Sequence, residues 1–321
     1  MLENTSFAFV ANLLDVQCNL PFNVIENCYF QKANSIQIAQ IKKYLSDSGY
    51  LYGLSKFNLS PYELVYIEDL SKPTQKSFKS QQLEEDWKYY ILTFNGNNSI
   101  IYDLSLAANL AKVELEFGLQ FIRHPESEGF GILKNPIHSF NYFHEMNTNS
   151  FLTEPAEYID EKILQDIGSI YSNYKQLDET RYPDIKQAIQ MLEDLKHIPN
   201  HSKFKVLGLF TIIEFLITHK PIDTGDSIIR QVTTKIPLLS KRFSEELDYS
   251  KFFGNTPQNT IWKKLYAYRS NIAHGGQSDF AKELSVLKDD LTVKKFLKLA
   301  VKMLLQHSLI EPQLYTDLRE C

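Results

Sequence analysis

The hydrophobic pattern of this chain changes once, near Asn147–Pro155, and that change constrains the fold more than any other feature. Before it, apolar and aromatic residues occur in short runs of strand length, such as Phe7–Leu14 and Tyr89–Phe94. After it, apolar residues recur every three or four positions, which is the spacing of amphipathic helices. The sequence therefore predicts a mainly α protein, with a mixed α/β region over residues 1–150 and an all-α helical bundle over residues 156–321.

The first region contains one predicted helix among the predicted strands. Asn34 and Ser35 can cap its start, the isoleucines that follow have helical spacing, and Gly49 ends it. Residues 100–119 mix strand and helix features, whereas Phe130–Phe143 is consistent with a strand and a loop. No glycine-rich phosphate loop, nucleotide-binding fingerprint or nucleophile elbow occurs here, so this region indicates no chemistry of its own.

Six helices are predicted in the second region, separated by prolines, glycines and polar caps. We expect the first two to pack antiparallel, because Pro183 can start the second soon after the first ends. Ser202 can cap the third, which is strongly apolar, and Pro221 follows its end. The predicted helices are Ile159–Leu177, Asp184–His197, Lys203–Thr218, one from Asp226 with an interruption at Pro237, one within Thr260–Gly276, and a final amphipathic helix over Thr292–Ser308.

Composition places the chain among ordinary globular proteins. Its 321 residues are 43% hydrophobic and 23% charged, and a secretory signal pattern is not visible. The longest apolar run, Val206–Thr218, contains Glu214 and is too short to cross a bilayer. We therefore expect a cytoplasmic protein that does not contact the membrane. The three cysteines have neither disulfide-framework nor zinc-ligand spacing, so we expect free thiols, no metal and no cofactor.

Charge is spread unevenly along the chain. The net charge is -5, but Lys196–Ile310 holds 18 Lys and Arg against 10 Asp and Glu, a net charge of +8, which leaves -13 on the rest. This asymmetry is consistent with an acidic partner for the basic part, with docking of the acidic part on the basic part, or with lysine-rich solvated helix faces. Four lysines of the last predicted helix are expected on its solvated outer face: Lys294, Lys295, Lys298 and Lys302.

Glu214 is the only charged residue inside the apolar stretch Val206–Ile217. An ionised carboxylate among such residues is costly to desolvate unless it meets a cation or several hydrogen-bond donors. Arg269 is the candidate partner, because it follows Tyr268 on a helix whose apolar stripe would pack against its neighbours. The alternative is that Glu214 lies at the edge of the apolar face and is solvated.

Arg269 and His274 stand five positions apart near the end of the fifth predicted helix. Five residues of regular α-helix turn through about 500°, so the two side chains would project about 140° apart. Gly275 and Gly276 predict that this helix ends just after His274, and a long Arg side chain can then reach across the terminal turn toward His274. A guanidinium can bind phosphate, and an imidazole can transfer a proton near neutral pH, which together suffice for metal-free RNA cleavage. The alternative is a surface Arg and a His that caps the helix.

The histidines elsewhere do not predict a metal site. His138, His144 and Glu145 lie near one another in sequence, but no third ligand follows at a useful spacing. His197 and His201 flank a predicted turn. We therefore expect these histidines to be satisfied locally or exposed to solvent.

The segment LYAYRSNIAHGG, residues 265–276, resembles the signature of the HEPN superfamily, an Arg followed after four to six residues by a His. The form with Arg-Ser before Ile-Ala-His-Gly is most similar to the Apea-like HEPN branch. The resemblance covers Ser202–Ile310, where an apolar helix with a central Glu, an intervening helix, the Arg–His helix and a closing amphipathic helix follow in the order of that family. Residues 1–150 have no comparable match.

This resemblance implies a metal-independent endoribonuclease that acts as a homodimer, with two motifs meeting in one composite cleft. The implied reaction is attack of the ribose 2′-hydroxyl on the adjacent phosphate. The resemblance assigns acid–base catalysis to His274, binding of the scissile phosphate to Arg269, and the orientation of Arg269 to Glu214. Asn271 is expected to hydrogen-bond the phosphate, and Lys263 and Lys264 are the nearest candidates for contacts with the RNA backbone.

Many members of this branch are associated with bacterial defence against phage and cut tRNA or other RNA once triggered. Residues 1–150 would then be a sensor or inhibitory module, and a phage-derived trigger or an inhibitory partner would bind the protein. The chain departs from the family pattern at Gly276, where members paired with a nucleotidyltransferase antitoxin often carry Tyr, so regulation through that position is not expected. The alternative function is a non-catalytic RNA- or protein-binding HEPN module that keeps this helix for dimer packing.

Overall fold

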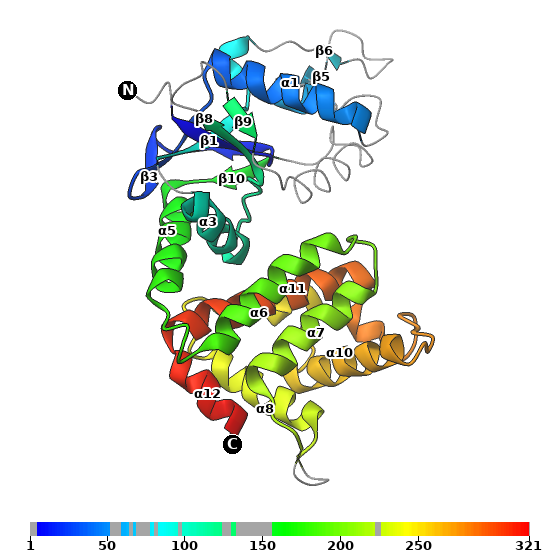
Figure 1. Cartoon of the computed structure of the whole chain (residues 1–321). Coiled ribbons are helices and arrows are strands. Elements are labelled where there is room, and N and C mark those ends of the chain that lie inside the picture. The colour runs from blue at the N-terminus through cyan, green and yellow to red at the C-terminus, as the bar shows by residue number, and fades with distance from the viewer. Residues whose placement is uncertain are drawn as a thin grey trace. The chain divides into compact units, whose positions relative to one another are not determined.

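A computed structural model describes residues 5–51, 59–63, 67–68, 78–79, 83–95, 98–123, 130–132, 156–221 and 226–320. The chain divides into two compact units, one of residues 1–109 and 113–168 and the other of residues 110–112 and 169–321. The first contains an antiparallel sheet and the second is helical, which confirms the predicted fold class (Figure 1). The division falls inside helix α5, Glu161–Gln176, whose first half belongs to the sheet-containing unit.

The sheet of the first unit has six strands, and every neighbouring pair is antiparallel. The predicted strands at Phe7 and Tyr89 are confirmed as the two central strands, in which nearly every residue is buried. Burial on both faces explains why these runs are continuously apolar instead of alternating. The strand order is β3 (Phe22–Ile25), β4 (Cys28–Lys32), β7 (Tyr90–Phe94), β1 (Ser6–Val10), β8 (Leu119–Arg123) and β9 (Phe130–Ile132).

Two short ladders accompany this sheet. The predicted strand Phe7–Leu14 is interrupted after Val10, and the chain resumes as β2, Leu14–Val16, which pairs in parallel with β10, Glu157–Ile159. Strands β5, Ile67–Glu68, and β6, Phe78–Lys79, form a two-residue antiparallel ladder.

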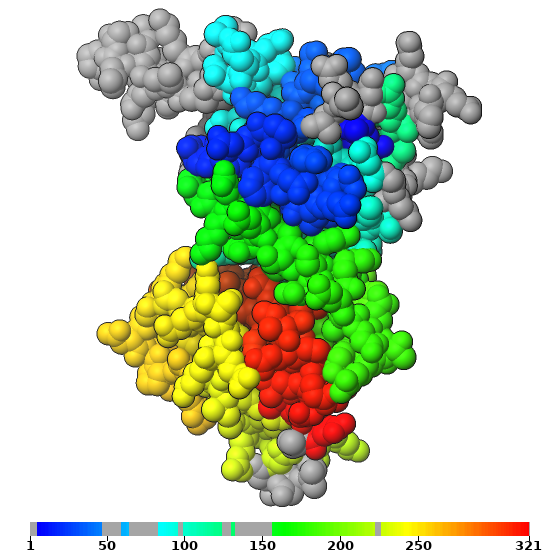
Figure 2. All heavy atoms as spheres, turned by 90° about the vertical axis from the view of Figure 1, so that its left-hand side faces the viewer, coloured from blue at the N-terminus to red at the C-terminus, as the bar shows by residue number. Residues whose placement is uncertain are grey.

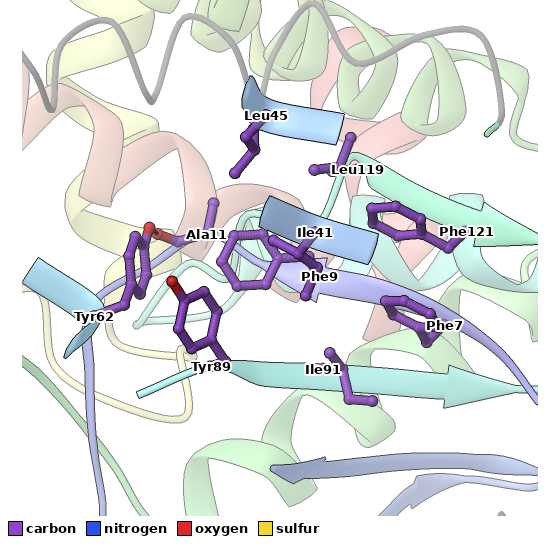
Figure 3. Close-up of a cluster of buried hydrophobic side chains, with 10 residues drawn as sticks. All are labelled: Phe7, Phe9, Ala11, Ile41, Leu45, Tyr62, Tyr89, Ile91, Leu119 and Phe121. Atoms are coloured by element: carbon purple, nitrogen blue, oxygen red, sulfur yellow. Dashed lines mark hydrogen bonds between the residues drawn. The ribbon is translucent and has the colours of Figure 1, made fainter. Parts of the chain in front are cut away.

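The predicted helix is confirmed as α1, Ser35–Leu51, although it continues past Gly49, where it was expected to end. It covers one face of the sheet (Figure 1). Its start is capped reciprocally: the Gln37 backbone N–H donates to Asn34 Oδ1, and the Asn34 N–H donates to Gln37 Oε1, both at 2.9 Å. The short helix α2, Ser60–Glu63, brings Tyr62 to the same core, where its hydroxyl donates to the Ala11 carbonyl. Figure 3 shows this core: Phe7, Phe9, Ala11, Ile41, Leu45, Tyr62, Tyr89, Ile91, Leu119 and Phe121.

The opposite face of the sheet lies toward α3, Asn98–Leu110, and the first half of α5 (Figure 1). Residues 100–119 could not be assigned to a helix or a strand from the sequence. The structure shows that they are helical as far as Leu110, where α3 ends. Gly168 of α5 lies against β3, because a Cβ built there would stand 2.4 Å from the Val24 carbonyl oxygen. Only glycine allows the helix and the strand to approach so closely.

The second unit is built around α7, Phe204–Ile217. This helix packs against α6, α8, α10, α11 and α12, which explains why its sequence is apolar on almost every side. Its neighbours are α6 (Pro183–Asp194), α8 (Ile228–Ser240), α10 (Gln258–Ala273), α11 (Asp290–Ile310) and α12 (Pro312–Glu320), while the one-turn α9 spans Tyr249–Phe253. Helix α8 continues through Pro237, where the sequence suggested an interruption.

Two predictions about the helices of this unit are wrong. Helix α6 packs against α7 and α11, so it is not mainly the antiparallel partner of α5. The helix over Thr292–Ser308, which was expected to be the last, is followed by α12, which begins at Pro312. Figure 2 shows this C-terminal segment, in red, on the surface of the helical unit, where Arg242 holds Glu311 at 2.7 Å and Arg319 pairs with Asp184.

The prediction that four lysines of α11 face solvent is wrong for two of them. Lys295 and Lys298 are exposed, but Lys294 and Lys302 are buried. The Lys294 ammonium donates to the Asn200 carbonyl at 2.9 Å, and that of Lys302 donates to the Ala111 carbonyl at 2.5 Å. The long aliphatic part of a lysine can lie along apolar neighbours while its ammonium group reaches a backbone acceptor. The periodicity of a sequence does not show whether a lysine does this.

Other expectations concern single residues. His197 and His201 are exposed, as predicted, and Cys18 and Cys28 are free thiols. His138, His144, Glu145 and Cys321 lie outside the described residues. No helix within the described ranges is long and apolar enough to span a lipid bilayer.

Candidate functional site

Helix α10 carries the Arg–His motif and is fixed in the bundle by one buried face. Ile261, Leu265 and Tyr268, which belong to the predicted stripe, are fully buried, whereas Ile272 is half-buried. Trp262, which the stripe did not include, is also buried, and its indole N–H donates to the Tyr249 hydroxyl at 3.0 Å. The opposite side of the helix is consequently the one that carries exposed and half-exposed polar groups.

The C-terminal end of α10 is a Schellman turn. His274 is the C-cap residue, and Gly275 has φ +69°, a left-handed conformation that favours glycine. The Gly276 N–H donates to the Asn271 carbonyl at 2.7 Å, and the Gly275 N–H donates to the Ile272 carbonyl at 3.3 Å. The predicted helix end just after His274 is therefore confirmed, and the paired glycines are the local cause.

Arg269 and Glu214 form the ion pair that the sequence predicts. Arg269 Nη2 lies 3.2 Å from Glu214 Oε2, and the two side chains are 27% and 20% exposed. Burial raises the pKa of Glu214, and the neighbouring Arg269 opposes that rise only in part. Glu214 Oε1 and Arg269 Nε are both buried and have no hydrogen-bond partner among the residues that the structure describes. The pair therefore connects α7 to α10 through one nitrogen of Arg269, Nη2, and one oxygen of Glu214, Oε2.

A second polar contact holds α10 against α11 one residue before Arg269. The Tyr268 hydroxyl donates to Asp290 Oδ1 at 2.5 Å, and Asp290 Oδ2 pairs with the Lys294 ammonium at 2.5 Å. Burial, together with the Asp290 carboxylate, raises the pKa of Tyr268. Sequence reasoning missed this contact; the only signal for it is the helical i, i+4 spacing of Asp290 and Lys294.

His274 and Asn271 stand at the open end of the helix. The His274 side chain is exposed, and its imidazole has no hydrogen-bond or ionic partner within the described part of the chain. The Asn271 side chain is half-buried and donates to the Gln277 carbonyl at 3.3 Å, so one of its amide hydrogens is used by the following loop. Helix α10 is regular as far as Ala273, but His274 is the C-cap residue with φ −100° and ψ 8°, so the regular-helix angle of about 140° does not apply to its side chain.

The two lysines expected to contact RNA differ in their surroundings. Lys263 is exposed and has no ionic partner among the residues that the structure describes. Lys264 is half-buried and helps to lower the pKa of Glu283, after the larger effect of the Asp279 N–H that this carboxylate accepts. Of the two lysines, Lys263 is therefore the one whose ammonium group is more available to bind a phosphate.

The structure therefore brings Glu214 to Arg269 and leaves His274 as a separate exposed group in the same chain. Across the described ranges, no group of three or more His, Cys, Asp or Glu side chains is arranged to hold a metal ion. Comparison of the chain with known proteins finds no matching family model, no similar curated protein and no similar solved structure.

Proposed function

We propose that this protein is a metal-independent endoribonuclease that acts as a homodimer through Arg269 and His274. The observation that carries the proposal is the Arg269–Glu214 ion pair, at 3.2 Å, on the helix that ends in the exposed His274. A half-buried guanidinium held by one carboxylate oxygen is a suitable group for binding a phosphate diester, because it stays charged and keeps free N–H donors.

In the proposed reaction the RNA supplies its own nucleophile. The 2′-oxygen forms a bond to phosphorus while the bond from phosphorus to the 5′-oxygen breaks, which leaves a 2′,3′-cyclic phosphate and a 5′-hydroxyl end. An imidazole takes the proton of the 2′-hydroxyl, and an imidazolium returns a proton to the departing 5′-oxygen. Arg269 stabilises the negative charge that grows on the phosphate, Asn271 is positioned to hydrogen-bond it, and Lys263 and Lys264 contact flanking phosphates.

A second copy of the chain explains how the groups converge. Within one chain, Arg269 lies on α10 and His274 is the C-cap residue that follows it, and His274 has no orienting side chain in the described residues. Catalytic bases are usually oriented by a further group. In a homodimer with two-fold symmetry, each His274 can face the Arg269 of the partner, which makes two Arg–His half-sites in one composite cleft.

The cellular role follows from the resemblance and completes the proposal. We place the activity in the cytoplasm, where free thiols such as Cys18 and Cys28 persist, and in antiviral defence against phage. RNA, including tRNA, is the substrate. The sheet-containing unit then restrains the nuclease or senses a phage-derived trigger.

One observation favours a second candidate, a non-catalytic RNA- or protein-binding module. The His274 imidazole makes no hydrogen bond, ion pair or ring contact in the described chain, so it is equally suited to contact a partner without transferring protons. This candidate predicts retained binding and no cleavage.

The test is cleavage of RNA by the purified protein, alone and after expression with candidate triggers, in the presence of EDTA. We expect cyclic-phosphate ends, and a loss of roughly 100-fold or more for His274→Ala and for Arg269→Ala. His201→Ala and Arg230→Ala, which change exposed residues of the same unit, serve as matched controls and should cleave like the parent. Equal cleavage by the parent and the two site variants would show that Arg269 and His274 are not catalytic.

A further inference from the structure

Tyr266 is a second unusual feature of α10 beside the ion pair. Its side chain is half-buried, and it lies one turn before Arg269, whose guanidinium carbon stands 5.8 Å from the centre of its ring. The ring is held from α7 by the fully buried Phe210, edge to face at 6.3 Å between centroids. Tyr266 is thus a fixed aromatic group with part of its surface open to solvent.

The hydroxyl of Tyr266 is not used by the fold. Among the described residues it makes no hydrogen bond, whereas Tyr268, Tyr62 and Tyr89 each donate to an acceptor within the protein. Buried tyrosine hydroxyls normally find a partner, so an unpartnered one belongs to a side chain that faces the solvent or a ligand. Tyr266 therefore supplies an aromatic ring whose hydroxyl forms no hydrogen bond with the described part of the protein.

The neighbours of Tyr266 on the helix indicate what such a ligand carries. Residues three and four positions apart lie on the same face of a helix. On this face Lys263 lies one turn before Tyr266, and Arg269 and Ser270 lie one turn after it. Lys263 is exposed, and Ser270 is half-buried. An aromatic ring between two cations is the arrangement by which proteins bind single-stranded nucleic acid, with the cations on successive phosphates and the ring on a base.

We infer that Tyr266 stacks on an unpaired nucleobase next to the phosphate that Arg269 binds, and that the substrate is single-stranded RNA. This inference rests on the proposed function for the placement of the phosphate on Arg269. A base in a duplex is already stacked and paired, so it cannot lie flat on a side chain that is anchored in the bundle. Tyr266 is then a specificity-determining residue, since it selects loops and single strands over helices.

The experiment measures binding to oligonucleotides that cannot be cleaved, because every 2′-hydroxyl is methylated. One is a single strand that contains the fluorescent base 2-aminopurine, the second has abasic sites, and the third is a duplex. We expect the parent and Tyr266→Phe to bind the single strand equally and to quench its fluorescence, while Tyr266→Leu binds about 10-fold more weakly and does not quench. Tyr182→Leu is the matched control, because the Tyr182 ring also lies beside an arginine, at 5.1 Å from Arg181.

The abasic strand and the duplex separate stacking from a general effect on folding. We expect the parent to bind both about 10-fold more weakly than the single strand, and Tyr266→Leu to bind all three alike. The inference is overturned if the parent binds the abasic strand or the duplex as tightly as the single strand, if it binds none of them, or if Tyr266→Leu matches the parent.

Failure of the inference and failure of the proposed function give different results. If the binding results are as expected but the parent never cleaves natural RNA, the stacking role stands and the nuclease proposal fails. If natural RNA is cleaved in EDTA, and Tyr266→Leu does so with an unchanged KM and without a preference for single strands, only the stacking role fails.

Discussion

Glu214 is the one carboxylate of the apolar helix α7. A lone carboxylate in an apolar helix requires either a cation or an edge position, and the residues alone left both open. The fold places it 3.2 Å from Arg269 and 20% exposed, so it is a paired group near an edge. Arg269 could be proposed as the partner because it follows a buried stripe. The Tyr268–Asp290 contact could not, since it depends on how α10 and α11 cross.

The pairing of Glu214 with Arg269 predicts that a substitution of Glu214 can lower the cleavage rate while the free energy of unfolding hardly changes. Glu214→Gln keeps an oxygen that can accept from Arg269 Nη2 but removes a charge whose burial is unfavourable, as its raised pKa indicates. We expect unfolding free energy to change by less than about 1 kcal/mol, because the lost attraction and the relieved desolvation oppose each other. Cleavage should fall roughly 10-fold, because the guanidinium is less firmly oriented.

Denaturant unfolding and initial cleavage rates check this prediction. Glu283→Gln is the control, because this exposed carboxylate in the same unit accepts from the Asp279 backbone and has no contact with Arg269. A parental cleavage rate for Glu214→Gln would mean that Glu214 does not orient Arg269.

At the scale of elements, two helix ends were predictable because their signals are local, whereas α1 continues past Gly49 and α8 continues through Pro237. Asn34 caps α1, and Gly275 ends α10, each through hydrogen bonds within a few residues. What surrounds a helix was less predictable. Lys294 and Lys302 fit a solvated face by periodicity, yet both reach backbone carbonyls in the interior. Helix α12 was also missed, since a proline is equally suited to follow one helix and to begin another.

The junction of α11 and α12 contains a buried histidine. His307 is 4% exposed, its Nδ1 lies 3.1 Å from the Tyr315 hydroxyl, and its Nε2 lies 3.6 Å from Glu311 Oε1. The ring of Phe243 packs on it, and Arg242 binds Glu311. Burial lowers the pKa of His307, Glu311 opposes this effect, and Arg242 adds to it.

This environment predicts loss of stability in mild acid. A histidine whose pKa is lower in the folded than in the unfolded chain binds its proton more readily when unfolded. Its contribution to stability is therefore complete above about pH 6.5 and decreases as the pH falls below that value. We expect the melting temperature to drop between about pH 7.5 and about pH 5.5 in the parent, and to drop less in His307→Gln.

Thermal melts followed by circular dichroism at each pH check this expectation. His201→Gln, at an exposed position, should keep the parental pH dependence. The same slope in the parent and in His307→Gln would rule out His307 as the titrating group.

At the scale of the whole molecule, two cores follow from the change of hydrophobic pattern. One is the aromatic layer between the sheet and α1, and the other surrounds α7. The excess of basic residues between Lys196 and Ile310 lies almost entirely in the helical unit, which also holds α10. A nuclease site in the basic unit is consistent with this distribution, since RNA binding depends on cations near the phosphates.

The proposed homodimer predicts complementation between two inactive variants. His274→Ala and Arg269→Ala should each be inactive, but in a mixed dimer one chain supplies Arg269 and the other supplies His274 to the same half-site. The purified mixed dimer keeps one intact half-site of two, so it should restore about half of parental cleavage. Co-expression with two different affinity tags, followed by tandem purification and a cleavage assay, measures this directly. A mixed dimer with no activity would place Arg269 and His274 of one chain in the same half-site.

The sequence by itself determined the two-region fold class, where α10 ends, and that Glu214 needs either a cation or an edge position. These properties depend on periodicity, caps and the cost of burying a charge, which act within a few residues or on one residue. Only the tertiary structure decided that Arg269 satisfies Glu214, that Lys294 and Lys302 are internal, and that Tyr266 stands beside Arg269 with its hydroxyl unused. Those facts depend on contacts between distant segments, whose geometry is set by how whole helices pack.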